Sequence, residues 1–458
     1  MAAAVLGGTI GWGAALGAEE LPEKPAESQD GAPTAGSGVS LSELGLAGRL
    51  TYKSFSHFRD VAHDGNFRNE GILQLEWRRK LASWSSIALV AEVRDDDGRF
   101  VRRIHHRFPD IEPHRSALSM KEAVLGLGSD LLRIELGKQI YTWGTGDAYN
   151  PTDQLNPYDY LDPIDREKMG VWSANATATA AGVSGQFVIV PLFTPSRDPL
   201  ENGRWVVLSE ESLPAVAVAN PFGIELPTGA TLQPRRIPAT GFDTLQYATR
   251  FKTTRAGWDL SVSYYDGFES TPVLRRPRGL VAATTFEPVY TRVKAPGLDF
   301  STTWQKFEFH GEAVAKFEEA RGKDDRFQGL LGLNYTLDDL GLRWLEQLVF
   351  VVEHARETNL SSRSRSDFLE SGAVANAFRD AVAGRLQAKF SQDTELTVGG
   401  SLDFTSDPSY YMQGKLVHKL QDTLHLEAGV DFFDGLKHTF WGKWRKNDRF
   451  FAAFKYFF

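Results

Sequence analysis

The chain has 458 residues, 12% of them aromatic and none of them cysteine, and its formal net charge is −8. The lack of cysteine excludes disulfide frameworks, thiolate-held zinc and iron–sulfur centres, and cysteine nucleophiles. The slight acidic excess contains no basic block, which argues against a nucleic-acid partner. No run of 18 apolar, uncharged residues occurs beyond the first 18 positions, so helical membrane spans are excluded.

The N-terminal region reads as two export-related segments. Residues 1–18 (MAAAVLGGTIGWGAALGA) are small, apolar and uncharged, which is typical of a signal peptide. A buried helix is the alternative, but five glycines in 18 residues oppose it. Residues 19–43 are rich in Pro, Glu, Ser and Gly and cannot bury a core, so we expect a flexible periplasmic segment.

From residue 44 to the end, apolar and polar side chains alternate with a period of two. In 87–94, for example, Ile87, Leu89, Ala91 and Val93 alternate with Ala88, Val90, Glu92 and Arg94. The same alternation occurs in 73–78, 132–139, 245–252, 385–390, 396–404 and 424–432. One such stretch is equally typical of a soluble antiparallel sheet, but about 18 of them favour a closed transmembrane barrel.

Short and long connections alternate between these stretches. Short turns are expected at Ser129-Asp130, Asp339-Leu340-Gly341 and Gln392-Asp393. The long connections are expected at 55–69, 95–116, 142–168, 191–243, 267–285, 318–325, 356–376 and 434–447. The fold class predicted for residues 44–458 is therefore all-β: a transmembrane antiparallel β-barrel of 16–18 strands, with short periplasmic turns and long extracellular loops.

Residues 137–170 read GKQIYTWGTGDAYNPTDQLNPYDYLDPIDREKMG. A Gly-x-Gln…Trp-Gly element ends a strand there, and an Asn-Pro-rich loop follows. This segment resembles the alginate-export-like group of porin-type bacterial outer-membrane β-barrel proteins. The resemblance implies a monomeric barrel whose substrate passes through the lumen. A regular ladder of Arg and Lys, which export of a polyanion would need, is not evident, because acidic and basic residues mix at the inward positions.

The loop at about 143–168 is the candidate pore constriction and solute-binding segment. Aromatic rings offer faces to a sugar or an apolar solute, and Asp side chains favour cations or hydroxyls. The alternative is a surface loop with ordinary Asn-Pro and Asp-Pro turns. The candidate residues are Trp143, Asp147, Tyr149, Asp153, Tyr158, Tyr160, Asp165 and Arg166.

Charged and amide side chains at the inward positions are the candidate lumen wall. Because a wide barrel encloses water, such a wall can set ion selectivity, or its charges can simply pair with one another. The candidates are Arg133, Glu135, Gln139, Glu92, Arg94, Arg250, Lys252, Arg385 and Lys389.

The C-terminus carries alternating aromatic residues. Phe454, Tyr456 and Phe458 share one strand face, and a terminal Phe in this pattern resembles the recognition strand of outer-membrane barrels. A buried strand of a soluble sheet is the alternative. We expect these residues to serve as the barrel-assembly signal.

These features together predict a non-enzymatic porin of the bacterial outer membrane for passive passage of a small or medium solute. No cofactor and no metal are expected. The expected partners are outer-membrane lipid, the barrel-assembly machinery and a small-molecule or oligosaccharide solute. Two alternatives remain open: a barrel component of a larger export or electron-conduit complex with a periplasmic or complex partner, and an outer-membrane barrel enzyme.

Overall fold

The computed structural model describes the chain from Gly45 to Phe458 with several internal gaps. The described ranges are 45–61, 65–105, 108–200, 203–206, 231–276, 285–363, 368–369 and 378–458. The segments expected at 1–18 and 19–43 lie outside these residues.

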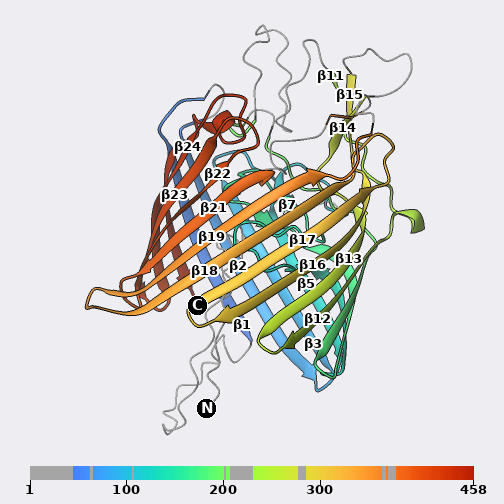
Figure 1. Ribbon diagram of the computed structural model, residues 1–458, viewed down its shortest axis with the longest axis horizontal. Coiled ribbons are helices and arrows are strands. Elements are labelled where there is room, and N and C mark those ends of the chain that lie inside the picture. Colours follow the sequence, from blue (N-terminus) through green and yellow to red (C-terminus); the bar gives the residue numbers. More distant parts are fainter. Residues whose placement is uncertain are drawn as a thin grey trace.

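Eighteen antiparallel strands form one closed ring (Figure 1). Each strand pairs with its predecessor and its successor, and the last strand, β25, pairs with the first, β1, from Arg49↔Phe457 to His57↔Arg449. The ring consists of β1 (Leu46–His57), β2 (Phe67–Ala82), β3 (Ser85–Asp96), β5 (Arg115–Gly128), β6 (Leu132–Gln139), β9 (Val171–Ala180), β10 (Val183–Val190), β12 (Gln246–Arg255), β13 (Trp258–Phe268), β16 (Arg292–Trp304), β17 (Phe307–Glu318), β18 (Arg326–Leu342), β19 (Leu345–Asn359), β21 (Asp380–Lys389), β22 (Thr394–Asp403), β23 (Ser409–Gln421), β24 (Leu424–Asp434) and β25 (Arg449–Phe457). The predicted fold class is confirmed, at the upper strand number.

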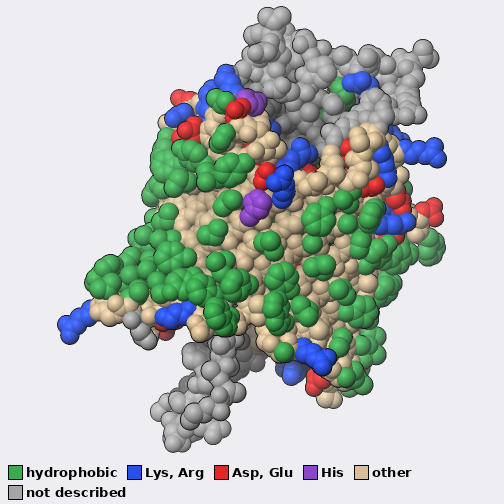
Figure 2. Space-filling model, in the orientation of Figure 1, with side chains coloured by type: hydrophobic (Ala, Val, Ile, Leu, Met, Phe, Trp, Pro, Cys, Tyr) green, Lys and Arg blue, Asp and Glu red, His purple; other side chains and the backbone are tan. Residues whose placement is uncertain are grey.

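The ring turns an apolar surface outward and a polar one inward. On β25, the expected face of Phe454, Tyr456 and Phe458 is exposed, whereas Arg449 and Lys455 on the opposite face are buried. Exposed Leu, Val, Phe and Trp side chains recur around the outside (Figure 2). This inversion of the soluble pattern, together with closure that leaves no sheet edge, suits a hydrocarbon surrounding. The protein is therefore a membrane-spanning β-barrel.

The two ends of the ring differ in the length of their connections, as predicted. At one end lie tight turns, two of which are the dipeptides Ala181-Gly182 and Ala256-Gly257, with positive φ at both positions. Mirror-image turns of this kind match the twist of paired strands, and their second position suits glycine. At the other end lie the long connections: 58–66, 97–114, 140–170, 191–245, 269–291, 319–325, 360–379, 404–408 and 435–448.

The sequence missed two details of these connections. The connection 404–408 was not among the expected long connections, and it spans only five residues between β22 and β23. The turn expected at Asp339-Leu340-Gly341 lies at Arg343-Trp344 instead, since β18 continues through a register shift between Asp338 and Leu342.

Short elements accompany the long connections. A four-stranded sheet stands above the rim, at the top of Figure 1, and β4 pairs in parallel with β5. The described helices are two short 3₁₀ turns, and none of them is long and apolar enough to span a membrane. The short elements are β4 (Val101–His105), β7 (Tyr158–Asp159), β8 (Glu167–Lys168), β11 (Thr231–Leu232), β14 (Val273–Arg275), β15 (Thr285–Val289), β20 (Phe368–Leu369), η1 (Phe242–Thr244) and η3 (Gly442–Trp444).

Candidate functional site

Residues 140–170, here called the inner segment, connect β6 to β9 and contain the short pair β7–β8. Much of this segment is buried although it belongs to a connection: Trp143 is 3% exposed, Leu161 1% and Asp162 1%. Its hydrogen bonds run to inward-facing side chains of the ring, and β7 is visible within the ring in Figure 1. The inner segment therefore lies inside the barrel.

The first arm of the inner segment, residues 145–152, is held through its backbone by Glu312 on β17. Thr145 N and Gly146 N donate to Glu312 Oε1 at 2.6 and 2.7 Å. Thr152 donates to Glu312 Oε2 from its backbone N at 3.1 Å and from its hydroxyl at 2.8 Å. Charge-assisted bonds of this kind are roughly twice as strong as neutral ones, so one carboxylate fixes the turn at both ends.

A second carboxylate, that of Glu353 on β19, also binds the backbone of the first arm. The backbone N atoms of Asp147 and Ala148 donate to its two oxygens at 2.5 and 2.7 Å, and the His310 ring meets it at 2.7 Å. The Asp147 side chain in turn accepts two bonds from Arg385 on β21, at 2.9 and 3.1 Å. The first arm thus reaches three strands on one side of the ring.

The second arm of the inner segment, residues 159–167, carries acidic residues. They form ion pairs with basic residues on strands across the ring from those that hold the first arm. Asp159 accepts two bonds from Arg115 on β5, at 2.9 and 3.2 Å. Asp162 pairs with Arg68 on β2 at 2.8 Å and with Arg449 on β25 at 2.5 Å. These three acid–base contacts are buried, where removal of one partner leaves a costly uncompensated charge.

Two further acids extend the second arm. Lys53 on β1 donates to both oxygens of Asp165, at 2.9 and 2.8 Å. Glu167 accepts from Arg94 on β3 at 2.7 Å and from Lys121 on β5 at 2.6 Å. The inner segment is consequently held to strands on both sides of the barrel.

Burial and ion pairing shift the pKa values of individual acids of the inner segment in opposite directions. Burial acts to raise the pKa of Asp162, but Arg449 and Arg68 outweigh it and hold that pKa well below its usual range. The pKa of Asp159 is lowered in the same way by Arg115 and Arg197. At Asp147 burial prevails over Arg385, and the pKa is raised to about 7.

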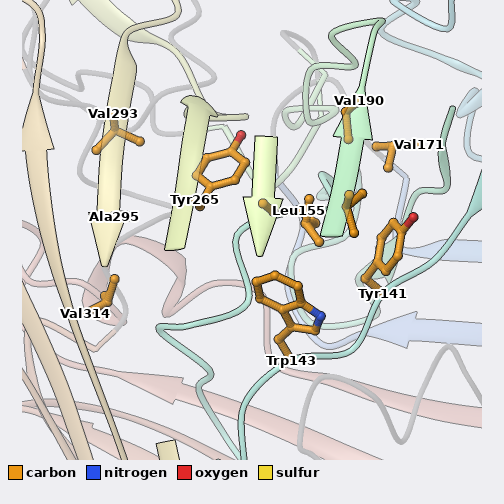
Figure 3. Packing of buried hydrophobic residues seen from close by; sticks show 11 residues of the cluster. Tyr141, Trp143, Leu155, Val171, Val190, Tyr265, Val293, Ala295 and Val314 are labelled. Atoms are coloured by element: carbon orange, nitrogen blue, oxygen red, sulfur yellow. The ribbon is translucent and has the colours of Figure 1, made fainter. Parts of the chain in front are cut away.

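A third side of the inner segment packs on an apolar part of the wall. Tyr141, Trp143 and Leu155 form one cluster with side chains from strands β9 to β17 (Figure 3). The wall members of this cluster are Val171, Val188, Val190, Ala248, Tyr265, Val293, Ala295 and Val314. This wall departs from the expected polar lumen. The physical reason is that these strands are covered on both faces, by lipid outside and by the inner segment inside.

The remaining candidate residues of the loop contact one another, the wall and Phe378. Trp143 donates from Nε1 to Gln186 at 3.1 Å, and Asp153 pairs with Lys168. Tyr149 stacks on Phe378, with ring centroids 5.0 Å apart. Tyr158 and Tyr160 lie 5.6 Å apart, and the Arg166 guanidinium lies 5.2 Å from the centre of the Tyr158 ring.

The candidate wall residues fall into three groups. Arg94 and Arg385 hold the inner segment, and Glu92 pairs with Arg94 at 2.9 Å and with Lys121 at 3.3 Å. Gln139 bonds to Glu135 O and to Ser173, and Arg250 pairs with Asp299 at 2.9 Å. Nearer the short turns, Arg133 pairs with Glu135 while remaining largely exposed, Lys252 is exposed, and Lys389 is half-buried.

An aromatic pocket with a volume of about 70 Å³ lies between the inner segment and the wall at β21–β23. The inner segment contributes Ala148, Tyr160, Pro163, Ile164 and Arg166. The wall and the 435–448 connection contribute Ala383, Gly400, Ser401, Tyr411, Gln413, Phe440, Trp441 and Trp444, and Phe378 completes the lining.

A larger cavity of about 780 Å³ opens among the long connections. Its lining includes Arg68, Asp162, Trp205, Arg99 and Arg102. It therefore adjoins the second arm of the inner segment from the side of the long connections. Among the described residues, no group of three or more His, Asp or Glu side chains is placed to hold a metal ion.

Sequence reasoning predicted Arg385 as a wall residue but missed the two carboxylates that hold the backbone of the first arm and the histidine beside one of them. Glu312, Glu353 and His310 were ordinary inward positions of alternating strands, and they lie more than 150 residues from the loop that they hold. A local signal did exist for the apolar wall. The run Phe187-Val188-Ile189-Val190 is apolar on both faces, which indicates a strand covered on both sides.

No protein-family model and no curated protein matches the sequence. Solved structures that resemble the fold include a porin and an outer membrane protein. Pseudomonas aeruginosa OccK11 (OpdR) has 10% identity and a TM-score of 0.49, over 90% of this chain and 94% of that chain. A mutant of the Rh. blastica porin has 10% identity and a TM-score of 0.41, over 90% and 99%. A loop-deletion mutant of OmpT, an outer membrane protein of Vibrio cholerae, has 9% identity and a TM-score of 0.40, over 90% and 98%.

Proposed function

We propose that this protein is an outer-membrane channel for passive passage of a small or medium solute, and that the inner segment narrows its lumen. The observation that carries the proposal is the anchoring of residues 140–170 to inward-facing charges on both sides of the ring. An eighteen-stranded barrel without such a segment encloses a wide aqueous space. A segment held across it restricts passage to what fits beside it.

Diffusion through such a lumen requires no covalent step, and we propose a non-enzymatic role. The pairing of inward acids with inward bases supports a small solute rather than a polyanionic chain. A polymer such as alginate would need a continuous row of free cations, whereas Arg68, Arg94, Arg115 and Arg449 are all engaged with acids of the protein itself. The likeness of residues 137–170 to the alginate-export-like group therefore extends to architecture and not to cargo.

Single-channel conductance in a planar bilayer tests this proposal. Wild-type protein is compared with a deletion of residues 147–163, which removes the middle of the inner segment. We expect discrete open-channel currents from wild type and a several-fold larger conductance from the deletion. Heat-shifted gel mobility establishes that both barrels are folded.

The matched control changes an ion pair outside the inner segment. Lys294 and Glu319 are both roughly half exposed and lie 3.1 Å apart, so a Lys294→Gln/Glu319→Gln variant should conduct like wild type. Folded wild type and folded deletion that both fail to conduct would overturn the channel proposal and favour a component of a larger complex. Equal conductance of the two would overturn the constriction.

A further inference from the structure

The inner segment covers the inside of the ring unevenly. Its described hydrogen bonds and ion pairs reach β17, β19 and β21 from the first arm and β1, β2, β3, β5 and β25 from the second. Its apolar cluster covers β9 to β17. The aromatic pocket lies at the remaining sector, against Ser401 of β22 and Tyr411 and Gln413 of β23.

Small wall residues leave room in that sector. Ala383 on β21 and Ser401 on β22 line the pocket, and both are nearly fully buried. A buried water needs roughly 10–15 Å³ of such a cavity, so 70 Å³ corresponds to about five waters. That is room for one six-membered ring with its immediate substituent.

Six aromatic side chains line the pocket, which favours a ring-shaped solute. Tyr411 and Trp441 lie 5.1 Å apart between ring centres, and Trp441 meets Phe440 at 4.7 Å and Trp444 at 6.0 Å. Aromatic pairs at 4.5–7 Å contribute beyond their buried area, and the same geometry extends to a ring bound between them. Tyr160 and Phe378 belong to the facing side of the pocket.

The polar groups of the pocket favour an anion. Arg166 is the only charged side chain in the lining. It contacts Tyr158 and Tyr160, and no carboxylate of the described residues forms a salt bridge with it. Trp441 Nε1 and Ser401 Oγ are buried polar atoms without a hydrogen-bond partner in the described part of the chain, in side chains that are each 6% exposed. Such orphaned groups cost free energy unless a ligand satisfies them.

We propose that the aromatic pocket binds a solute consisting of a single six-membered ring that carries one carboxylate. The ring lies among the aromatic side chains, the carboxylate accepts charge-assisted bonds from Arg166, and Trp441 Nε1 and Ser401 Oγ supply the remaining hydrogen bonds. A neutral polyol has no negative charge to pair with Arg166. An ammonium group would be repelled by the positive charge of Arg166. This inference rests on the proposed channel function, which brings the solute to the pocket.

Equilibrium dialysis of the full-length protein, folded in detergent micelles, measures binding without measuring transport. Four probes separate the chemistry: benzoate and glucuronate carry a carboxylate on an aromatic ring and on a sugar ring, benzyl alcohol is neutral, and benzylamine is cationic. We expect benzoate or glucuronate to bind at least tenfold more tightly than the neutral and cationic rings. Which of the two binds more tightly identifies the ring as aromatic or sugar.

Two variants test the residues. Arg166→Gln should weaken carboxylate binding about 10- to 100-fold, the usual weight of a hydrogen bond to a charged group, and Arg166→Lys should restore part of it. Arg133→Gln is the matched control, because it removes one arginine near the short turns, away from the pocket, and should change binding less than twofold. Trp441→Phe, which keeps the ring and removes the donor, should weaken binding a few-fold.

The outcomes separate this inference from the channel proposal. Benzyl alcohol that binds as tightly as benzoate would overturn the role of the carboxylate. Failure of every probe to bind folded protein that does conduct in the bilayer would overturn the pocket and leave the channel intact. Carboxylate binding by folded protein that does not conduct would support the pocket and overturn the channel.

Discussion

Asp162 holds two strands of the ring that are far apart in the sequence. Its carboxylate meets Arg68 on β2 and Arg449 on β25, and all three side chains are almost completely buried. Arg449 also pairs with Asp431 at 2.7 Å, so the group forms a chain of alternating charge. Buried charges in such a chain are satisfied only together, because each loses hydration that its partners must replace.

Removing the charge of Asp162 should therefore cost more than removing an exposed charge. Asp162→Asn leaves Arg68 and Arg449 short of one anion, and we expect the free energy of unfolding to fall by about 3–5 kcal/mol. Glu319→Gln, which breaks an exposed pair, should cost less than about 1 kcal/mol. Urea unfolding of the barrel in lipid vesicles measures both. Equal effects would show that the Asp162 contacts are not formed.

Acid should break the ion pairs of Asp159, Asp162 and Glu167 only at low pH. The pKa values of Asp159, Asp162 and Glu167 are lowered by their basic partners, so their stabilisation is complete above the unfolded-state values of about 4 and is lost as pH falls through the lower folded-state values. Since the chain has no cysteine, a spin label on a Pro163→Cys variant reports the second arm alone. We expect an immobile label from pH 8 to pH 4.5. Mobility that rises between pH 7 and 5 would contradict the assigned ion pairs.

At the scale of the strand, alternation alone predicted most of the ring, because each strand face meets a different solvent along its whole length. Strands such as Ser85–Asp96 and Leu424–Asp434 followed directly from the period of two. The strand end at Leu342 did not, since a register shift leaves no mark in hydrophobicity. The inward position of the 143–168 loop could be anticipated from its aromatic and acidic residues, but its partners Glu312 and Glu353 could not, because contacts across more than 150 residues carry no local signal.

The closing pair of strands offers a test at the same scale. Gly48 on β1 lies directly beneath the ring of Phe458, and a Cβ at this position would overlap that ring. Gly48→Val should displace the terminal side chain and lower the yield of heat-modifiable, folded barrel several-fold. Gly71→Val on the neighbouring strand is the control, since a Cβ there meets no atom within 4 Å. Similar yields for the two variants would argue against a close fit of Phe458.

At the scale of the whole molecule, carboxylates of the inner segment neutralise basic residues that face the inside of the barrel. Residues 147–163 contain four carboxylates, Asp147, Asp153, Asp159 and Asp162, and no Lys or Arg. Three of them pair with bases of the wall, Asp147 with Arg385, Asp159 with Arg115 and Asp162 with Arg449, whereas Asp153 pairs with Lys168 of the inner segment itself. The charge of the lumen is thus a property of the assembled barrel and not of either part.

Deleting residues 147–163 should shift the ion selectivity of the channel toward anions. The deletion removes carboxylates that pair with basic residues of the wall, whereas the acidic residues of the wall keep their basic partners. The lumen therefore gains net positive charge. Reversal potentials under a salt gradient, measured on wild type and on the deletion, report the shift. Unchanged selectivity with a larger conductance would mean that ions avoid the sector where these bases lie.

The pairing of β1 with β25 has a consequence for the order of events during folding. Gly48 and Phe458 exchange backbone hydrogen bonds in both directions, at 2.8 and 3.0 Å, across almost the full length of the chain. Until β25 has paired with it, β1 has an open edge, and hydrocarbon offers no hydrogen-bond partner to its unpaired amides. Contacts of such sequence separation form slowly. Closure of the ring in a membrane therefore requires β25 to be available for pairing, and a chain that lacks β25 would keep an open edge on β1.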